Sequence, residues 1–252
     1  MFRGGKEVKS GVSNLCSTLK FADSGIQIDV NGLKFNMIKV KGGTFIMGDN
    51  NLADPLHDAS PEHAVTVSDY YIAETEVTNE LWALVNGGSI LSGISGYREA
   101  VKMKVWDDII VFIDKLNKLT GLNFRLPYEA EWEYAALGGS KSKGYKYSGG
   151  DEIALVALYN NTSGDVASKY PNELGIYDMS GSAWEHCIDF YGKYSSDAQI
   201  NPKGPDTGEY HVLRGGYYGS NASECLVKYR RTDSTVGSKN GFGLRLVLDI
   251  QQ

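Results

Sequence analysis

The chain has 252 residues, of which 42% are hydrophobic and 22% are charged, a composition that is ordinary for a globular protein with a sizeable core. Its formal net charge of -6, without any Lys/Arg cluster longer than Arg230–Arg231, argues against nucleic acid as a partner. No apolar run approaches the roughly 18 residues of a membrane span, and the N-terminus lacks the apolar core of a signal peptide, so we expect neither, and the compartment stays open.

The first part of the chain combines a polar start with a clear hairpin pattern. Residues 1–25 are polar and without periodicity, so we expect a flexible leader, followed by a single domain over residues 26–252. Residues 26–30 and 33–38 alternate in polarity on either side of Asn31-Gly32, the dipeptide most typical of a tight hairpin turn. The pattern predicts a β-hairpin, and short strands follow over 40–48 and 63–67.

Three amphipathic segments predict helices near 78–86, 105–119 and 128–137. Thr78 can cap the first helix, Gly121 can end the second, and Pro127 can open the third. Beyond residue 139 the chain consists of short strands and loops, which favours an α+β fold over a wound parallel sheet. We expect the four tryptophans to supply most of the large aromatic burial: Trp82, Trp106, Trp132 and Trp184.

The stretch 217–240 has an unusual composition and lies between two strand-like segments, 211–214 and 244–248. Of its 24 residues, 13 are Tyr, Ser, Asn, Thr or Gly. Antibody paratopes favour these types, because Tyr offers rigid contact area and the small polar residues offer adaptable hydrogen bonds. The composition indicates a binding surface, and an ordinary polar surface loop is the alternative that it leaves open.

Six segments, in order along the chain, resemble the formylglycine-generating enzyme (sulfatase-modifying factor) family, whose domain is a glycine-rich variant of the C-type lectin fold. They are MIKVKGGTFIMGD (37–49), ETEVTNELW (74–82), FRLPYEAEWEYAALGG (124–139), NELGIYDMSGSAWEHCIDFYG (172–192), VLRGGYY (212–218) and GLRL (243–246). The resemblance implies an α+β domain of this type with little regular secondary structure.

Enzymes of this family oxidise a sulfatase cysteine to formylglycine with copper(I), which two cysteines hold after a double glycine. In register with Gly215-Gly216, these two positions fall at Ser220 and Cys225. A serine hydroxyl is a hard ligand that replaces a thiolate on copper(I) poorly, so we expect no copper and no copper-dependent oxidation. The alternative is a formylglycine-generating oxidoreductase that uses Cys225 as its reactive thiol. A disulfide between Cys187 and Cys225 is a further alternative under oxidising conditions.

The resemblance also implies a calcium site with two side-chain carboxylates and two main-chain carbonyls, which are hard oxygen ligands. Its ligands would be Asp178, Gly181, Ala183 and Glu185. A second interpretation stays open, in which the two acids cap turns and pair with buried arginines such as Arg214 or Arg245.

A known use of this fold is in the variable proteins of diversity-generating retroelements, in which adenine-directed mutagenesis changes C-terminal codons on a fixed frame. We therefore favour a non-catalytic domain that binds a protein or another macromolecular ligand through residues 217–240, and we expect exchange of its side chains to affect folding little. The expected ligand-binding residues are Tyr217, Tyr218, Ser220, Asn221, Ser223, Glu224, Lys228 and Arg231. The expected frame residues are Gly215, Gly216, Ala222, Cys225, Val227, Arg230, Gly243 and Arg245. A purely structural accessory domain is a third interpretation.

Overall fold

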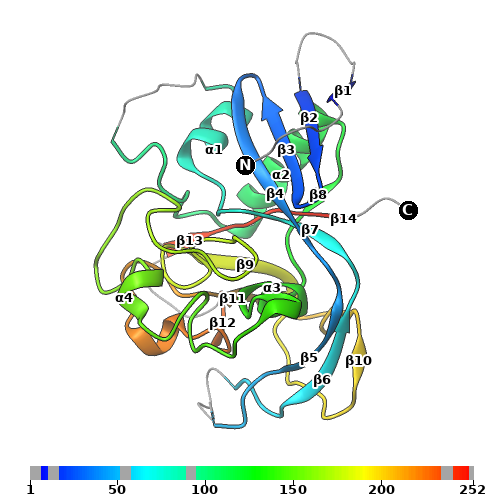
Figure 1. Ribbon diagram of the computed structural model, residues 1–252, viewed down its shortest axis with the longest axis vertical. Coiled ribbons are helices and arrows are strands. Elements are labelled where there is room, and N and C mark those ends of the chain that lie inside the picture. The colour runs from blue at the N-terminus through cyan, green and yellow to red at the C-terminus, as the bar shows by residue number, and fades with distance from the viewer. Residues whose placement is uncertain (1–6, 11–16, 52–57, 89–94, 234–240, 250–252) are drawn as a thin grey trace.

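The computed structural model describes residues 7–10, 17–51, 58–88, 95–233 and 241–249, and these form three sheets with few helices (Figure 1). The seven-stranded sheet has the order β1 (Glu7–Ser10), β2 (Ser17–Ala22), β3 (Gly25–Val30), β4 (Leu33–Val40), β7 (Tyr70–Ala73), β14 (Val247–Asp249) and β8 (Phe124–Arg125). The three-stranded sheet has the order β10 (Gln199–Ile200), β6 (His63–Val67) and β5 (Gly43–Met47). The four-stranded sheet has the order β12 (Arg230–Thr232), β11 (His211–Arg214), β9 (Trp184–Phe190) and β13 (Phe242–Gly243).

The predicted hairpin is confirmed, because β3 and β4 pair antiparallel with Val30 opposite Leu33. Its two turn residues have positive φ, 51° at Asn31 and 92° at Gly32, and turns of this kind match the twist of the strands that they join. The strand predicted over 211–214 is also present as β11, whereas only the end of the 244–248 segment lies in a strand, β14.

The expected flexible leader over residues 1–25 is wrong for residues 7–10 and 17–22, which form β1 and β2 and pair antiparallel. Residues 17–22 also pair with the full length of β3 and place Leu19 against the first core cluster. Within residues 17–22, polar and apolar residues alternate only from Thr18 to Phe21, so the sequence signal is short. A hairpin partner that offers a free edge is what orders it.

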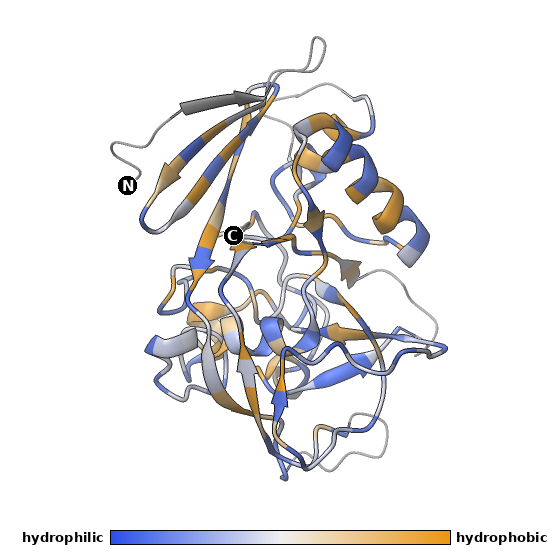
Figure 2. Cartoon of the chain, turned by 90° about the vertical axis from the view of Figure 1, so that its right-hand side faces the viewer, coloured by the Kyte–Doolittle hydropathy of each residue, from blue (hydrophilic) through white to orange (hydrophobic). Residues whose placement is uncertain are grey.

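The three predicted helices are confirmed as α1 (Asn79–Val85), α2 (Trp106–Thr120) and α3 (Glu129–Ala136). The Thr78 hydroxyl accepts the Leu81 amide hydrogen bond at 3.2 Å, and Gly121 ends α2 with a φ of 70°. Figure 2 shows polar and apolar stripes along α2. Three shorter helices were not predicted: η1 (Gly139–Lys141), α4 (Ile153–Val156) and η2 (Ala222–Cys225). None of the helices in the described ranges is long and apolar enough to cross a membrane.

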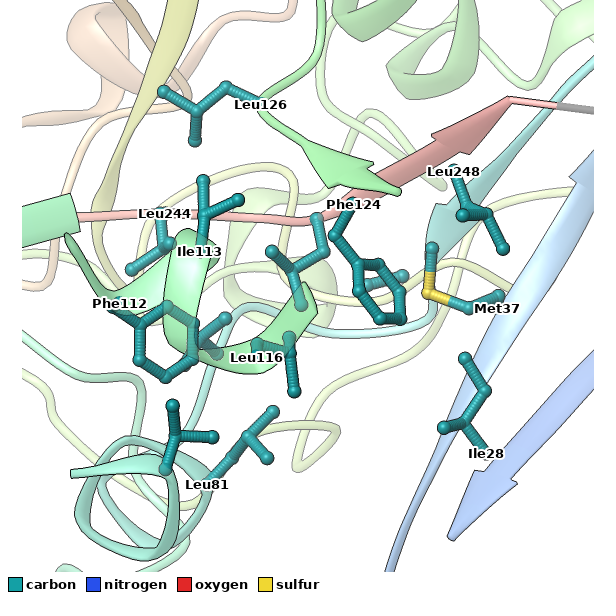
Figure 3. Close-up of a cluster of buried hydrophobic side chains, with 14 of the residues drawn as sticks. Ile28, Met37, Leu81, Phe112, Ile113, Leu116, Phe124, Leu126, Leu244 and Leu248 are labelled. Atoms are coloured by element: carbon teal, nitrogen blue, oxygen red, sulfur yellow. The ribbon is translucent and has the colours of Figure 1, made fainter. Parts of the chain in front are cut away.

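Two clusters of buried side chains hold these elements together. The first lies between β3, β4, α1 and α2 and contains Met37 and Phe112 (Figure 3). The second surrounds Trp132 of α3 and includes residues of β6, β9 and β11. Strand β4 contributes to both clusters, Met37 to the first and Val40 to the second.

The tryptophan prediction holds for only two of the four residues. Trp132 and Trp184 are buried, at 0% and 1% exposure, whereas Trp82 and Trp106 are only partly buried. Trp82 stacks on Phe112 with ring centroids 4.6 Å apart. Apolar periodicity identifies the side of a helix that faces the core, but it does not show how deeply each side chain on that side is buried.

Candidate binding surface

A buried ion network anchors β11 and β12 beneath the C-terminal segment. The Arg230 guanidinium contacts both carboxylate oxygens of Glu129 at 2.8 Å, and Arg214 donates to Glu129 at 3.3 Å and to Glu133. Burial alone would raise the pKa of Glu129, but Arg230 and Arg214 together hold it below its usual value. Buried charges persist only when they are paired and hydrogen-bonded, so this network fixes two strands against α3.

The backbone of residues 217–220 is held by main-chain hydrogen bonds. The amide of Tyr218 donates to the carbonyl of Ser182 at 3.0 Å, and its carbonyl accepts from Asn161 at 2.7 Å. The carbonyl of Ser220 accepts from the amide of Asn160 at 2.9 Å. Because these three partners are main-chain atoms, the path of the chain through Tyr218 does not depend on which side chain that position carries.

The burial of the expected residues separates frame from surface. Seven of the eight expected frame residues are buried, and the eighth, Ala222, is half-buried. Among the expected ligand-binding residues, Asn221 and Ser223 are exposed, and five are half-buried: Tyr217, Tyr218, Glu224, Lys228 and Arg231. Residues 234–240, the remainder of the predicted surface, lie outside the described residues.

Ser220 corrects the expectation that this set is uniformly exposed. Its side chain is 1% exposed, and its hydroxyl accepts a hydrogen bond from the Tyr217 amide at 3.2 Å. Ser220 therefore belongs to the frame. A small residue that closes a turn has the same type as a residue that faces a ligand, so composition did not separate the two.

Asn221 and Glu224 correct the expectation that these residues exchange freely. The Asn221 side chain accepts from the amides of Ser223 and Glu224 at 2.9 and 3.3 Å, and the Glu224 carboxylate accepts from the Asn221 amide at 3.1 Å. This reciprocal capping begins η2, and loss of such a cap costs about 1 kcal/mol. The Ser223 hydroxyl also donates to the Asn221 side chain, at 2.6 Å, whereas the side chains of Tyr218 and Lys228 take no part in this cap.

Aromatic and charged contacts shape the exposed part of this surface. The rings of Tyr217 and Tyr218 meet edge to face with centroids 5.2 Å apart, and Lys102 Nζ lies 4.5 Å from the Tyr218 ring centroid. The guanidinium of Arg231 lies over the Trp184 ring and 3.7 Å from Glu224. Such half-exposed contacts contribute about 0.5–1 kcal/mol each, so a ligand can displace them.

Cys225 is a buried thiol and not an accessible nucleophile. Burial raises its pKa to about 12, so the thiolate is scarce at neutral pH. Its sulfur packs against the backbone of Gly216, where an added Cβ would lie 2.8 Å from Sγ. Cys187 is also buried, and both are free cysteines among the described residues, so the disulfide that the sequence left open is absent there.

The expected metal ligands Asp178 and Glu185 have different surroundings. Asp178 Oδ2 accepts from the Ala167 amide at 2.6 Å, but Asp178 Oδ1 is buried without a hydrogen-bond partner among the described residues. Burial raises the pKa of this carboxyl to about 6. Glu185 instead accepts from Arg245 and from the Trp132 indole, both at 2.7 Å.

These contacts support a different interpretation for each of the two acids. Glu185 pairs with the buried Arg245, as expected if the acids pair with buried arginines, whereas Arg214 pairs with Glu129 and Glu133. The unpartnered oxygen of Asp178 fits a bound cation. Within the described ranges no group of three or more His, Cys, Asp or Glu side chains is arranged around a metal, so a cation here would depend on the carbonyls of Gly181 and Ala183.

Two buried acids, Glu76 and Asp189, were not predicted from the sequence. Glu76 is 2% exposed, neither carboxylate oxygen has a hydrogen-bond partner in the described part of the chain, and Arg245 lies 3.8 Å away. Asp189 is 4% exposed and accepts from the Glu129 amide at 2.8 Å. Burial, and then the charge of Glu129, raises the pKa of Asp189 to about 8. Asp189 is a single acid in a strand-like segment, whereas Glu76 follows Glu74 in a polar stretch before a helix, so the sequence gives little sign that either is buried.

Comparison with known proteins was made by sequence and by structure. The family model of the "Sulfatase-modifying factor enzyme 1-like domain" matches residues 30–250. The chain is 28% identical to the chaperone protein LppX of Paenibacillus barcinonensis over 84% of this chain and 89% of LppX. It is also 28% identical to the formylglycine-generating enzyme of Streptomyces coelicolor, over 84% of this chain and 88% of that enzyme. The serine/threonine-protein kinase Pkn1 of Chlamydia trachomatis is 28% identical over 89% of this chain, which spans only 40% of that protein.

Two solved structures share the fold. Treponema denticola variable protein 1 superposes with a TM-score of 0.77 at 28% identity, covering 89% of this chain and 98% of that protein. PvdO from Pseudomonas aeruginosa has a TM-score of 0.66 at 24% identity, covering 85% and 94%. The expected α+β class is therefore confirmed.

Proposed function

We propose that this chain, which belongs to the family of sulfatase-modifying factor enzyme 1-like domains, is a non-catalytic binding domain on the scaffold of that family. It presents side chains from residues 217–231 to a protein or another macromolecular ligand, in the manner of a variable protein of a diversity-generating retroelement. The structural similarity to Treponema denticola variable protein 1 supports this proposal. The observation that carries it is the backbone of residues 217–220, whose main-chain hydrogen bonds keep its path independent of the presented side chains.

The surface combines a rigid base with adaptable contacts. Arg214 and Arg230 hold the two strands from below through buried acids, and Cys225 and Val227 turn inward. Tyr218 offers a rigid aromatic face at the surface. Rigid aromatic anchors flanked by small polar residues bind with little loss of conformational entropy, which is how antibody paratopes achieve affinity.

The alternative is copper-dependent oxidation of a substrate cysteine, and the geometry of its two positions disfavours it. Ser220 is buried and accepts from a backbone amide, and Cys225 is protonated at neutral pH. With copper(I) and a Cys-x-Pro-x-Arg peptide, we expect no aldehyde product by mass spectrometry. The Streptomyces coelicolor enzyme serves as the positive control. Aldehyde formed by this chain at a rate near that of the control would contradict a non-catalytic function.

We also propose that calcium binds at Asp178, with Gly181, Ala183 and Glu185 as the further ligands. The unpartnered Asp178 oxygen supports the site, and the ion would supply the positive charge that this buried carboxylate lacks. We expect calcium to raise the melting temperature relative to chelator, because a ligand at 100 times its Kd stabilises by about 2.7 kcal/mol. In Asp178→Gly, which tolerates the local φ of 61°, this difference should vanish. Equal midpoints in the wild type would instead favour turn capping.

A further inference from the structure

A pocket of about 440 Å³ lies between β5 and the residues that follow η2, and Tyr218 is not among its lining residues. Phe45 and Tyr134 form part of its apolar lining, with ring centroids 5.2 Å apart, and Leu137 and Leu226 extend that lining. Polar groups stand among them, including Lys146. A concavity of this size that combines apolar side chains with a few charged groups suits a ligand with both apolar and charged parts.

The pocket opens along an unpaired strand edge. Within the described residues β5 is hydrogen-bonded to β6 alone, and β10 takes the other side of β6 (Figure 1). Successive side chains of a strand point to opposite faces, yet both Phe45 and Ile46 line the pocket, so the pocket reaches the edge of β5. Ile46 is 52% exposed. An edge strand with an exposed apolar residue is a template for one more strand.

The charge around the pocket favours an acidic partner. Lys146 is exposed, and two more exposed lysines precede it, Lys141 at the end of η1 and Lys143 in the following loop, on a chain whose net charge is -6. Lys228 lines the pocket from the other side and is 3.7 Å from Glu62. Asp49 is the one acidic residue among the described lining residues.

We propose that the edge of β5 and this pocket bind an extended peptide in which an acidic residue adjoins an aromatic or aliphatic one. The peptide main chain adds to β5 as a further strand, its apolar side chain enters the pocket, and its carboxylate meets Lys146 and Lys228. Strand addition supplies affinity through main-chain hydrogen bonds, and the pocket supplies specificity. This site goes beyond the surface proposed above, because apart from Leu226 and Lys228 its lining lies outside residues 217–231.

The test uses a phage-displayed library of random peptides selected on the whole immobilised protein. We expect enrichment of an acidic residue next to an aromatic or aliphatic one, and the enriched peptide is then synthesised with a fluorophore for polarisation measurements. Lys146→Glu should weaken its binding at least tenfold. The side chain of Lys146 is exposed and its structural bonds use main-chain atoms, so this variant should fold, which its melting curve checks. Lys228→Glu is a second variant with the same expectation.

Two controls separate this site from the C-terminal surface. Lys39→Glu, at an exposed position of β4 outside the pocket, should leave the affinity unchanged. Tyr218→Ala should also leave the affinity for the peptide unchanged, because Tyr218 belongs to the proposed exchangeable surface and does not line the pocket. Failure to enrich any peptide, an enriched motif without an acid, or equal binding by Lys146→Glu would overturn the proposal. Loss of binding in Tyr218→Ala would reassign the peptide to the C-terminal surface.

Discussion

Replacing Arg230 by methionine is expected to lower the free energy of unfolding by about 3–5 kcal/mol, the usual effect of removing one partner of a buried ion pair. Arg230 is 1% exposed and supplies two of the hydrogen bonds to Glu129. Without it, Glu129 keeps only the 3.3 Å contact to Arg214, the Tyr194 hydroxyl and its own large desolvation penalty. Urea denaturation of the variant and the wild type measures the difference.

The neighbouring arginine provides a matched control. Arg231 carries the same charge on the same strand, but its side chain is 21% exposed and lies 3.7 Å from a partly exposed Glu224. Arg231→Met should therefore change the free energy of unfolding by about 1 kcal/mol or less. If the free energy of unfolding falls by the same small amount in both variants, the buried ion network is not what holds β11 and β12 beneath the surface.

The stability of the wild type relative to Asp189→Asn is expected to fall as the pH rises from about 4 to about 8. Burial raises the pKa of Asp189 from 3.8 to about 8. Between these values the folded state keeps a proton that the unfolded state has already released, so each rise in pH favours unfolding. The slope is at most about 1.4 kcal/mol for each pH unit in that interval. Above the folded pKa the difference between the two proteins becomes constant.

Asparagine is a suitable replacement because its amide oxygen can still accept the hydrogen bond from the Glu129 amide. Glu129 itself has a lowered pKa, and its effect on stability has the opposite sign, but it is present in both proteins and cancels in the difference. Urea denaturation at a series of pH values gives both curves. Parallel curves would show that Asp189 is ionised in the folded state, with a charge partner that offsets its burial.

Local signals in the sequence predicted the elements well. Asn31-Gly32 fixed the first hairpin, because few dipeptides tolerate two consecutive positive φ angles. The Thr78 cap and the Gly121 stop placed α1 and α2 to within one or two residues of the predicted bounds. Strand β2 was missed, since so short an alternation, from Thr18 to Phe21, becomes a strand only when a neighbouring edge is available to it.

The site was harder to predict because its supports join distant parts of the chain. Arg230 and Glu129 are 101 residues apart, and Arg214 and Glu133 are 81 residues apart, so no local pattern pairs them. The division into frame and surface was recovered where residue type implies burial, as for Val227. It failed at Ser220, where a small polar residue serves a backbone amide instead of a ligand.

If this surface varies while its frame stays fixed, the DNA around the coding sequence should show it. We expect a near-identical second copy of the segment that encodes residues 212–248, close to a reverse transcriptase and differing only where the copy has adenine. The differing codons should include those of Tyr218, Ser223 and Lys228 and should spare those of Gly216, Val227 and Arg230, whose side chains or backbone are buried. A locus without such a copy, or one whose differences fall in the codons of the buried frame, would contradict a variable surface on a fixed frame.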